Sequence, residues 1–230
     1  MRFWDYKKLL FGGIGYVPSI PVIQDFIEKA WSKGFDLTGA SQLGNSIKDS
    51  KKMIGTTECA ALLRSFGIKY VKSFCKNSHF FSAKIVDFYS ARKPTVVQTT
   101  LAPVVVEPGK KKKPVSPFKP NKALANWVWE YFSSKTEKEM VPPLYLQHEG
   151  HSRTIIGIEK RGQQITLLLF DPSHFSSELQ KDLLVKKMNK IRKSLDTFTR
   201  DKYQIVYIDK GPITDIDGGR VVDSVRINDS

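Results

Sequence analysis

The sequence predicts an α+β domain in which helices pack on one face of a mostly antiparallel sheet. Helical patterns occupy its first part, and its second part holds short apolar runs joined by turns. The 230 residues, of which 40% are hydrophobic, suffice to bury one sizeable core. We therefore expect a single domain over 1–230.

Four segments carry apolar side chains at helical spacing, and we expect helices over 19–33, 56–66, 121–133 and 176–195. The first has Pro21 in its opening turn and Gly34 just past its end, where these residues are favoured. Gly67 follows the second helix in the same way. The inward side of the fourth is predicted to consist of Leu179, Leu183, Leu184, Ile191 and Leu195.

Apolar runs of strand length occur at 85–88, 144–147, 154–159, 165–170 and 204–208. A short basic turn with a glycine, 160–163, separates the third run from the fourth and predicts a β-hairpin. Residues 93–120, rich in proline and lysine, break every periodicity, so we expect a loop there.

The net charge of +14 raises nucleic acid as a partner. Much of the excess lies in Lys110–Lys113, inside the expected loop, and in the segment 181–193. Such runs are more often solvated surfaces than specific sites, so a nucleic-acid partner is the less favoured alternative.

No apolar run approaches the roughly 20 residues that cross a bilayer, and the N-terminus lacks the pattern of a secretory signal. We expect no membrane partner and an intracellular location, in the cytoplasm, the nucleus or both. The two cysteines, Cys59 and Cys75, cannot form a disulfide framework and show no metal-binding spacing. We expect reduced thiols, no metal and no cofactor.

His151 begins one expected strand and Asp171 ends its hairpin partner, so the hairpin would bring the two side chains together. An aspartate that accepts from one imidazole nitrogen leaves the other facing a nucleophile. The simpler alternative is a surface histidine and a turn-forming aspartate before Pro172. His148 and His174 suggest metal ligation as a third alternative, but side chains three residues apart on one strand point to opposite faces.

Several motifs, in the same order along the chain, resemble the papain-like family of the zinc-finger-containing ubiquitin peptidase and the ubiquitin-fold-modifier-specific proteases. They are the segments 17–21, 28–31, 34–36, 39–43, 54–59, 144–159, 167–172 and 202–205. The resemblance implies a papain-like fold and cysteine-dependent hydrolysis of bonds at the C-terminus of ubiquitin. In this comparison 70–83 is an insert.

Carried over by position, the resemblance makes His151 the catalytic histidine, Asp171 the third triad member and Gln147 the oxyanion donor. Asp36 and Glu58 match acidic positions that contact the basic surface of ubiquitin. Each also has a structural alternative, because Asp36 precedes a turn and Glu58 lies in the first turn of a helix, where negative charge is favoured.

The family's nucleophile lies upstream of 17–21, in a segment that resembles Trp-Gly-Cys-Gly-Tyr-Arg-Asn, and no cysteine occurs in 1–16. Cys59 is on an apolar helical stripe and Cys75 falls in the insert, so neither matches. We expect a fold that is incomplete at the N-terminus and a chain that is inactive alone.

Three hypotheses follow. The first is a thiol protease domain that acts on ubiquitin, polyubiquitin or a ubiquitin-like modifier, with the His and Asp of its triad present. The second is a catalytically inactive ubiquitin-binding relative. The third is a basic protein associated with nucleic acid.

Overall fold

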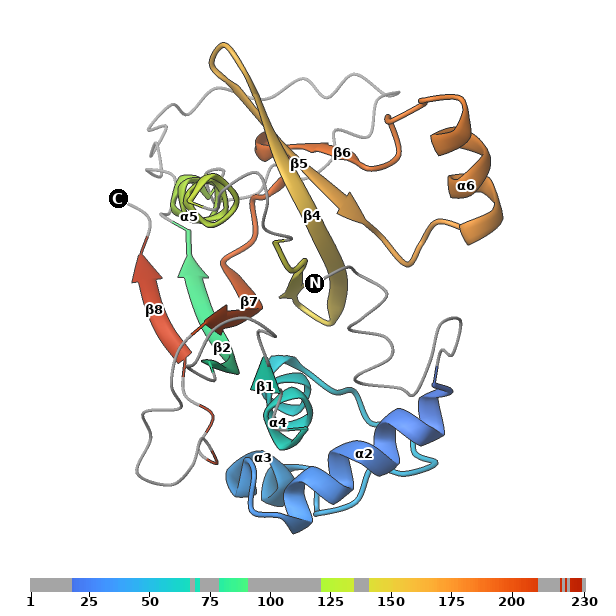
Figure 1. Cartoon of the computed structure of the whole chain (residues 1–230), viewed down its shortest axis with the longest axis vertical. Coiled ribbons are helices and arrows are strands. Elements are labelled where there is room, and N and C mark those ends of the chain that lie inside the picture. The colour runs from blue at the N-terminus through green and yellow to red at the C-terminus, as the bar shows by residue number, and fades with distance from the viewer. Residues whose placement is uncertain are drawn as a thin grey trace, which may run out of the picture.

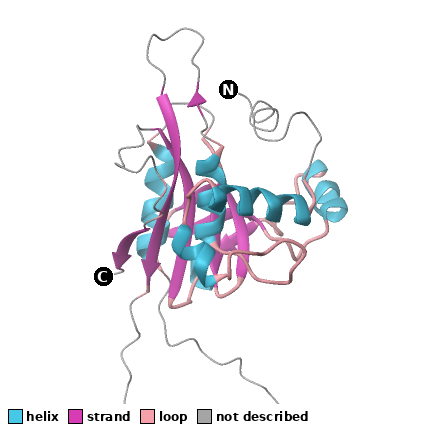
Figure 2. Ribbon diagram, turned by 90° about the horizontal axis from the view of Figure 1, so that it is seen from below, coloured by secondary structure: helices cyan, strands magenta, loops and turns pink. Residues whose placement is uncertain are grey.

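An eight-stranded sheet with helices on both of its faces forms the centre of the computed structural model (Figures 1 and 2). The structure describes residues 18–66, 69–70, 79–90, 121–134, 141–210, 220, 222 and 224–228. Along the sheet the strands follow the order β1-β2-β7-β3-β4-β5-β6, and β8 pairs with β2. Among the strand pairs of these residues, β2 and β8 are parallel and the others antiparallel. The predicted α+β class with a mostly antiparallel sheet is confirmed.

The strands are longer than the sequence predicted, chiefly because β2 begins at His79. Their bounds are β1 Lys69–Tyr70, β2 His79–Tyr89, β3 Leu144–His148, β4 His151–Arg161, β5 Gln164–Phe170, β6 Arg192–Ser194, β7 Lys202–Lys210 and β8 Ser224–Asn228. The predicted hairpin joins β4 and β5 through a turn at Gly162, which has the positive φ of 57° that such turns require.

The helices are α2 Ile20–Ser32, α3 Leu37–Gln42, α4 Thr56–Ser65, α5 Lys122–Ser133 and α6 Ser176–Leu184, with a 3₁₀ turn η1 at Leu195–Thr197. Three of the predicted helices therefore form close to their expected bounds. Asn121 caps α5, since its side chain accepts a hydrogen bond of 2.8 Å from the amide of Leu124. No helix of the described residues is long and apolar enough to cross a membrane.

Each face of the sheet has its own core, because successive side chains of a strand point to opposite faces. Ile205 of β7 packs in the cluster beneath α5, and its neighbour Val206 packs in the cluster beneath α4. The prediction of helices on one face was wrong. The neighbouring apolar residues Ile205 and Val206 were a sign that helices cover both faces. A strand that is covered on both sides does not alternate between apolar and polar residues.

The helix predicted over 176–195 is also shorter than expected. It ends at Leu184, and residues 192–194 form β6 on the edge of β5. Of its five predicted inward residues only Ile191 is buried, and it lies outside α6. Pairing with β5 satisfies the backbone of this segment, and Arg192 adds two hydrogen bonds to Glu159 at 2.9 and 3.0 Å.

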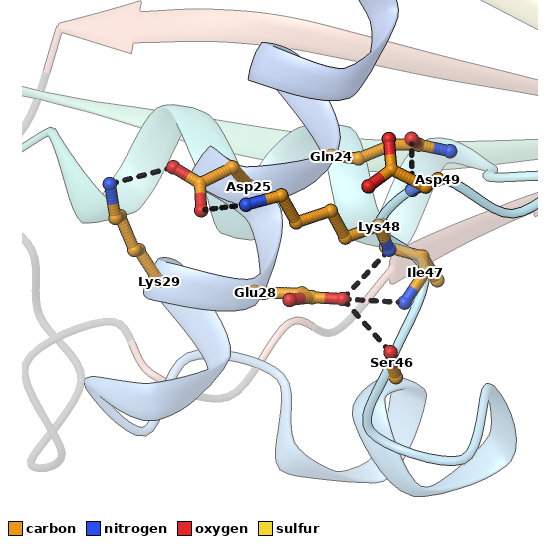
Figure 3. Close-up of polar contacts among 8 residues, drawn as sticks. All are labelled: Gln24, Asp25, Glu28, Lys29, Ser46, Ile47, Lys48 and Asp49. Atoms are coloured by element: carbon orange, nitrogen blue, oxygen red, sulfur yellow. Dashed lines mark hydrogen bonds and ion pairs between the residues drawn. The ribbon is translucent and has the colours of Figure 1, made fainter.

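Side chains of α2 fix the segment 46–50 that leads to α4 (Figure 3). One carboxylate oxygen of Glu28 accepts three hydrogen bonds, from the amides of Ile47 and Lys48 at 2.7 and 2.8 Å and the hydroxyl of Ser46 at 3.2 Å. The buried Gln24 accepts from the amide of Asp49 and donates to the carbonyl of Ser50, both at 3.0 Å. The entrance to α4 is thereby held against α2.

Three expectations fall wholly or partly beyond the described residues. All of the predicted loop 93–120 lies outside them, and so does Cys75. Of the predicted insert 70–83, the last part belongs to β2. The single domain over 1–230 and the insert remain predictions.

Candidate active site

The centre of the candidate site is the tight turn between β3 and β4. Glu149 and Gly150 form the turn with φ values of 39° and 75°, as a two-residue type I′ turn requires. His148 and His151 flank it as a register pair, and their ring centroids are 5.5 Å apart. The expectation that these two histidines point to opposite faces was wrong, because a turn separates them and they do not lie on one strand.

The hairpin of β4 and β5 brings His151 and Asp171 together as predicted. Asp171 follows the last residue of β5, and its Oδ2 lies 3.2 Å from Nε2 of His151. The carboxylate is buried, whereas the imidazole side chain is 37% exposed. Because Nε2 faces the carboxylate, Nδ1 is the nitrogen that can take a proton from a neighbouring group.

Arg153 holds the same carboxylate more tightly than the histidine does. Its Nε donates to Oδ2 of Asp171 at 2.7 Å, while the backbone amide of Ser173 donates to Oδ1 at 3.0 Å. Burial works against ionisation of this carboxyl, but the hydrogen bonds from Arg153, Ser173 and His151 outweigh it and hold its pKa well below the usual range. Asp171 is therefore a fixed anion.

His148 lies on the other side of Arg153, whose guanidinium is 3.0 Å from its Nε2. Burial and the positive charge of Arg153 lower the pKa of His148 to about 4, so this imidazole is neutral and accepts from the arginine. A cation at this position would have to displace Arg153. No cluster of three or more candidate metal ligands occurs in the part of the chain that the structure describes.

Gln147 reaches the opposite face of the β3–β4 hairpin. It pairs with Ser152, one position beyond the His148–His151 pair, so its side chain points toward α4. Its Oε1 accepts a hydrogen bond of 2.8 Å from the hydroxyl of Tyr145. Its amide also lies close to Gly55 at the start of α4. The hairpin end therefore carries the amide on one face and the histidine on the other.

Asp36 and Glu58 are both buried, with exposed fractions of 7% and 6%. Glu58 caps its own helix, since it accepts from the amide of Gly55 and the hydroxyl of Thr57. Asp36 caps α3 through the amide of Gly39, but its second oxygen, Oδ2, has no hydrogen-bond partner among the described residues. Burial raises the pKa of Asp36, and the nearby charge of Glu58 raises it further.

A pocket of about 290 Å³ opens beside Asp36 and is also lined by Thr38, Gln42 and Thr57. Thr57 lies two residues after Gly55, which is near the side-chain amide of Gln147. The first turn of α4 therefore borders both this pocket and the hairpin end.

Cys59 has the properties expected of a structural thiol. It lies on α4, and burial raises its pKa to about 11, although a hydrogen bond with Tyr145 opposes the shift. A thiol with such a pKa is almost wholly protonated at neutral pH and is a weak nucleophile.

Two residues of the site, Arg153 and Tyr145, were missed by the sequence analysis. Arg153 is two positions after His151 and Tyr145 two positions before Gln147. Because residues two apart on a strand are on the same face, this spacing was a signal that could have identified both.

Comparisons with known proteins identify the chain's relatives. Residues 5–206 match the model of peptidase family C78. The chain is 35% identical over 204 residues to zinc finger-containing ubiquitin peptidase 1 of Mus musculus, and 34% identical to that of Homo sapiens. Each alignment covers 84% of this chain and 29% of the relative, so the chain spans less than a third of the relatives' length.

A more distant relative is ubiquitin carboxyl-terminal hydrolase mug105 of Schizosaccharomyces pombe. It is 26% identical over 167 residues, which cover 73% of this chain and 52% of that protein. The family match covers most of the chain and includes the hairpin that carries His151. The chain belongs to peptidase family C78.

Proposed function

We propose that this chain is the proton-transfer and substrate-recognition part of a cysteine peptidase directed at ubiquitin or a ubiquitin-like modifier. The observation that carries the proposal is the pair of His151 and Asp171, in which a buried anion orients a partly exposed imidazole. Membership of a peptidase family and the names of the relatives support the substrate class.

In the proposed reaction, Nδ1 of His151 takes the proton of a cysteine thiol, and Asp171 stabilises the resulting imidazolium. The thiolate attacks the carbonyl carbon at the modifier's C-terminus. The negative charge that develops on the carbonyl oxygen is stabilised by the amide NH₂ of Gln147. His151 then protonates the leaving amine, and water hydrolyses the thioester. The partly buried Cys59 does not supply the thiol, since its pKa is raised to about 11.

Recognition of the modifier is assigned to Asp36 and its pocket. Within the described part of the chain, Oδ2 of Asp36 is a buried acceptor without a donor. The carboxylate beside the pocket would attract a lysine or arginine of the modifier that enters it. Glu58, whose oxygens already cap α4, adds negative charge nearby.

A second candidate is a catalytically inactive ubiquitin-binding domain. The observation that favours it is the unreactive character of Cys59, which is the one cysteine of the described residues. Both candidate functions bind the modifier through the pocket beside Asp36. They differ in whether a cysteine thiol lies next to His151.

A ubiquitin probe with a C-terminal electrophile separates the candidates. In the full-length gene product we expect one cysteine other than Cys59 to be labelled. His151→Ala should slow labelling by roughly 10²–10⁴-fold, because it removes the general base. Asp171→Asn should also slow it, whereas His174→Ala is the matched control and should not.

The chain of 230 residues should bind ubiquitin, and Cys59 should stay unlabelled. Labelling of Cys59 would contradict the proposed role of this thiol. Ubiquitin binding without labelling of the full-length protein would favour the inactive domain.

A further inference from the structure

The hydroxyl of Tyr145 is the centre of a polar cluster on the α4 face of the hairpin. It lies 2.8 Å from Oε1 of Gln147 and 2.8 Å from Oγ of Ser152. The thiol of Cys59 on α4 lies near this hydroxyl and contributes to its raised pKa. The three neighbours come from β3, β4 and α4, so the cluster joins the hairpin to the helix that covers it.

The chemistry of the groups fixes the direction of these hydrogen bonds. A carbonyl oxygen can only accept, so the single proton of Tyr145 goes to Oε1 of Gln147. The hydroxyl of Ser152 then donates to the tyrosine oxygen. Burial raises the pKa of Tyr145 to about 12 and that of Cys59 to about 11, so both protons are retained at neutral pH.

This arrangement determines which way the amide of Gln147 faces. With Oε1 bound to Tyr145, the NH₂ group points away from the cluster. In the described residues, Nε2 of Gln147 makes no hydrogen bond with the protein and lies beside Gly55. The reverse orientation would present a carbonyl oxygen where a donor is needed and would repel a developing oxyanion.

We propose that Tyr145 is a positioning residue, which holds the Gln147 amide with its NH₂ group available to the reacting carbonyl oxygen. The catalytic consequence rests on the proposed function, because Gln147 donates to an oxyanion only if the domain is a peptidase. The contact between the two side chains does not depend on that function.

A double-mutant cycle in the full-length gene product tests the inference. Gln147→Ala should lower kcat by roughly 10²–10³-fold, the usual effect of losing an oxyanion donor. Tyr145→Phe should lower kcat about tenfold with little change in KM, because one neutral hydrogen bond is lost. In the double variant Tyr145→Phe should cost nothing further, since the amide that it positions is gone.

Tyr131→Phe is the matched control. The Tyr131 hydroxyl donates to the carbonyl of Pro142 at 3.1 Å, and this side chain belongs to the core beneath α5. Its loss should leave kcat unchanged. If the effects of Tyr145→Phe and Gln147→Ala multiply in the double variant, Tyr145 acts independently of Gln147 and the inference is overturned.

NMR of the Gln147 side-chain amide in the 230-residue chain gives a readout without catalysis. Tyr145→Phe should shift the NH₂ resonances of Gln147, and Tyr131→Phe should not. Unchanged resonances in Tyr145→Phe would overturn the inference. If the wild-type full-length protein is not labelled by the ubiquitin probe but the resonances do shift, the proposed function fails while the positioning contact stands.

Discussion

One oxygen of the Asp171 carboxylate, Oδ2, contacts both Arg153 and His151, and the contact with Arg153 is the shorter. Oδ2 lies 2.7 Å from Arg153 and 3.2 Å from His151. The pair with Arg153 keeps the carboxylate charged and in place whether or not His151 carries a proton. The residue that orients the proposed base is thus itself oriented by an arginine that also holds His148.

Arg153→Met should lower the free energy of unfolding by roughly 2–3 kcal/mol, because the buried Asp171 would lose its strongest partner. The loss should persist from neutral pH down to about pH 4. The pKa of Asp171 is lowered on folding, so its stabilising contribution is present above the unfolded pKa and disappears only as the pH falls through the folded one. Urea denaturation measures the difference.

The control is Arg192→Met, which removes an arginine that makes two hydrogen bonds to the more exposed Glu159. It should have a smaller effect. An equal effect of the two variants would contradict the structural role given to Arg153.

His148 should make the fold less stable as the pH falls from about 6.5 to 4. Its pKa is lowered to about 4, so in this interval the unfolded chain binds a proton that the folded chain does not. Because the side chain is only half-buried, we expect a loss of roughly 1–2 kcal/mol across the interval. His148→Gln should remove this slope from urea titrations at several pH values. His174→Gln should retain it, and a slope that survives in His148→Gln would contradict the assignment.

At the scale of elements, α2 acts as a clamp on the entrance to α4 (Figure 3). Glu28 satisfies two backbone amides of the segment 46–50, while its neighbour Asp25 makes side-chain ion pairs with Lys29 and Lys48. These two acidic residues of one helix have different roles. Glu28 supplies acceptors to backbone amides that would otherwise be bonded within a helix or sheet. Asp25 makes ion pairs at the surface, which usually contribute little to stability.

Glu28→Gln should destabilise the protein by about 1 kcal/mol, because a neutral oxygen is a weaker acceptor for the amides of Ile47 and Lys48. Hydrogen exchange of these two amides should accelerate. The hydrogen bonds from Lys48 and Ile47 lower the pKa of Glu28, so the wild-type advantage should disappear in acid, as the carboxylate is protonated. Asp25→Asn is the matched control. Faster exchange at Ile47 in that control would argue against the assignment to Glu28.

Elements whose signals are local could be predicted from the sequence. The helices α2, α4 and α5 have apolar stripes within their own residues, α4 and α5 also have side-chain caps, and the hairpin of β4 and β5 has its turn. The segment 176–195 misled the prediction because its leucines have helical spacing, yet no residue of α6 is buried. The helix ends where Lys186 takes a positive φ of 57° and the amide of Lys187 donates to the carbonyl of Asp182. The chain then pairs as β6 with β5, a contact that periodicity does not encode.

At the scale of the whole molecule, contacts of the candidate site within one hairpin could be predicted from the sequence. Contacts between segments that are far apart in the chain could not. His151 and Asp171 are 20 residues apart on adjacent strands, and their contact follows from the hairpin. The neighbourhood of Gln147 needs α4 against the sheet, which brings Gly55 and Cys59 to β3. Similarly, the buried Asp87 accepts from Gln204 and Ser224, more than 100 residues away. Such contacts depend on strand order, which local patterns leave open.

The net charge of the whole chain leads to a last prediction, which separates binding through a pocket from binding through charge alone. A protein that binds DNA through lysines releases counterions, and its affinity falls by roughly 10³–10⁵-fold between 50 and 200 mM salt when 6–10 phosphates are contacted. The proposed ubiquitin binding through Asp36 would involve few charges and a buried carboxylate, so it should weaken far less over the same range.

Replacement of Lys110–Lys113 by glutamine removes four positive charges. The slope of log DNA affinity against log salt concentration should then become less steep by up to about 3–4. The affinity for ubiquitin should stay the same. Asp36→Asn should weaken ubiquitin binding and leave DNA binding unchanged, because it removes the carboxylate and keeps Lys110–Lys113. Fluorescence anisotropy with labelled ubiquitin and labelled duplex DNA measures both. DNA binding at micromolar affinity in 200 mM salt, without ubiquitin binding, would contradict the proposed function and favour the nucleic-acid hypothesis.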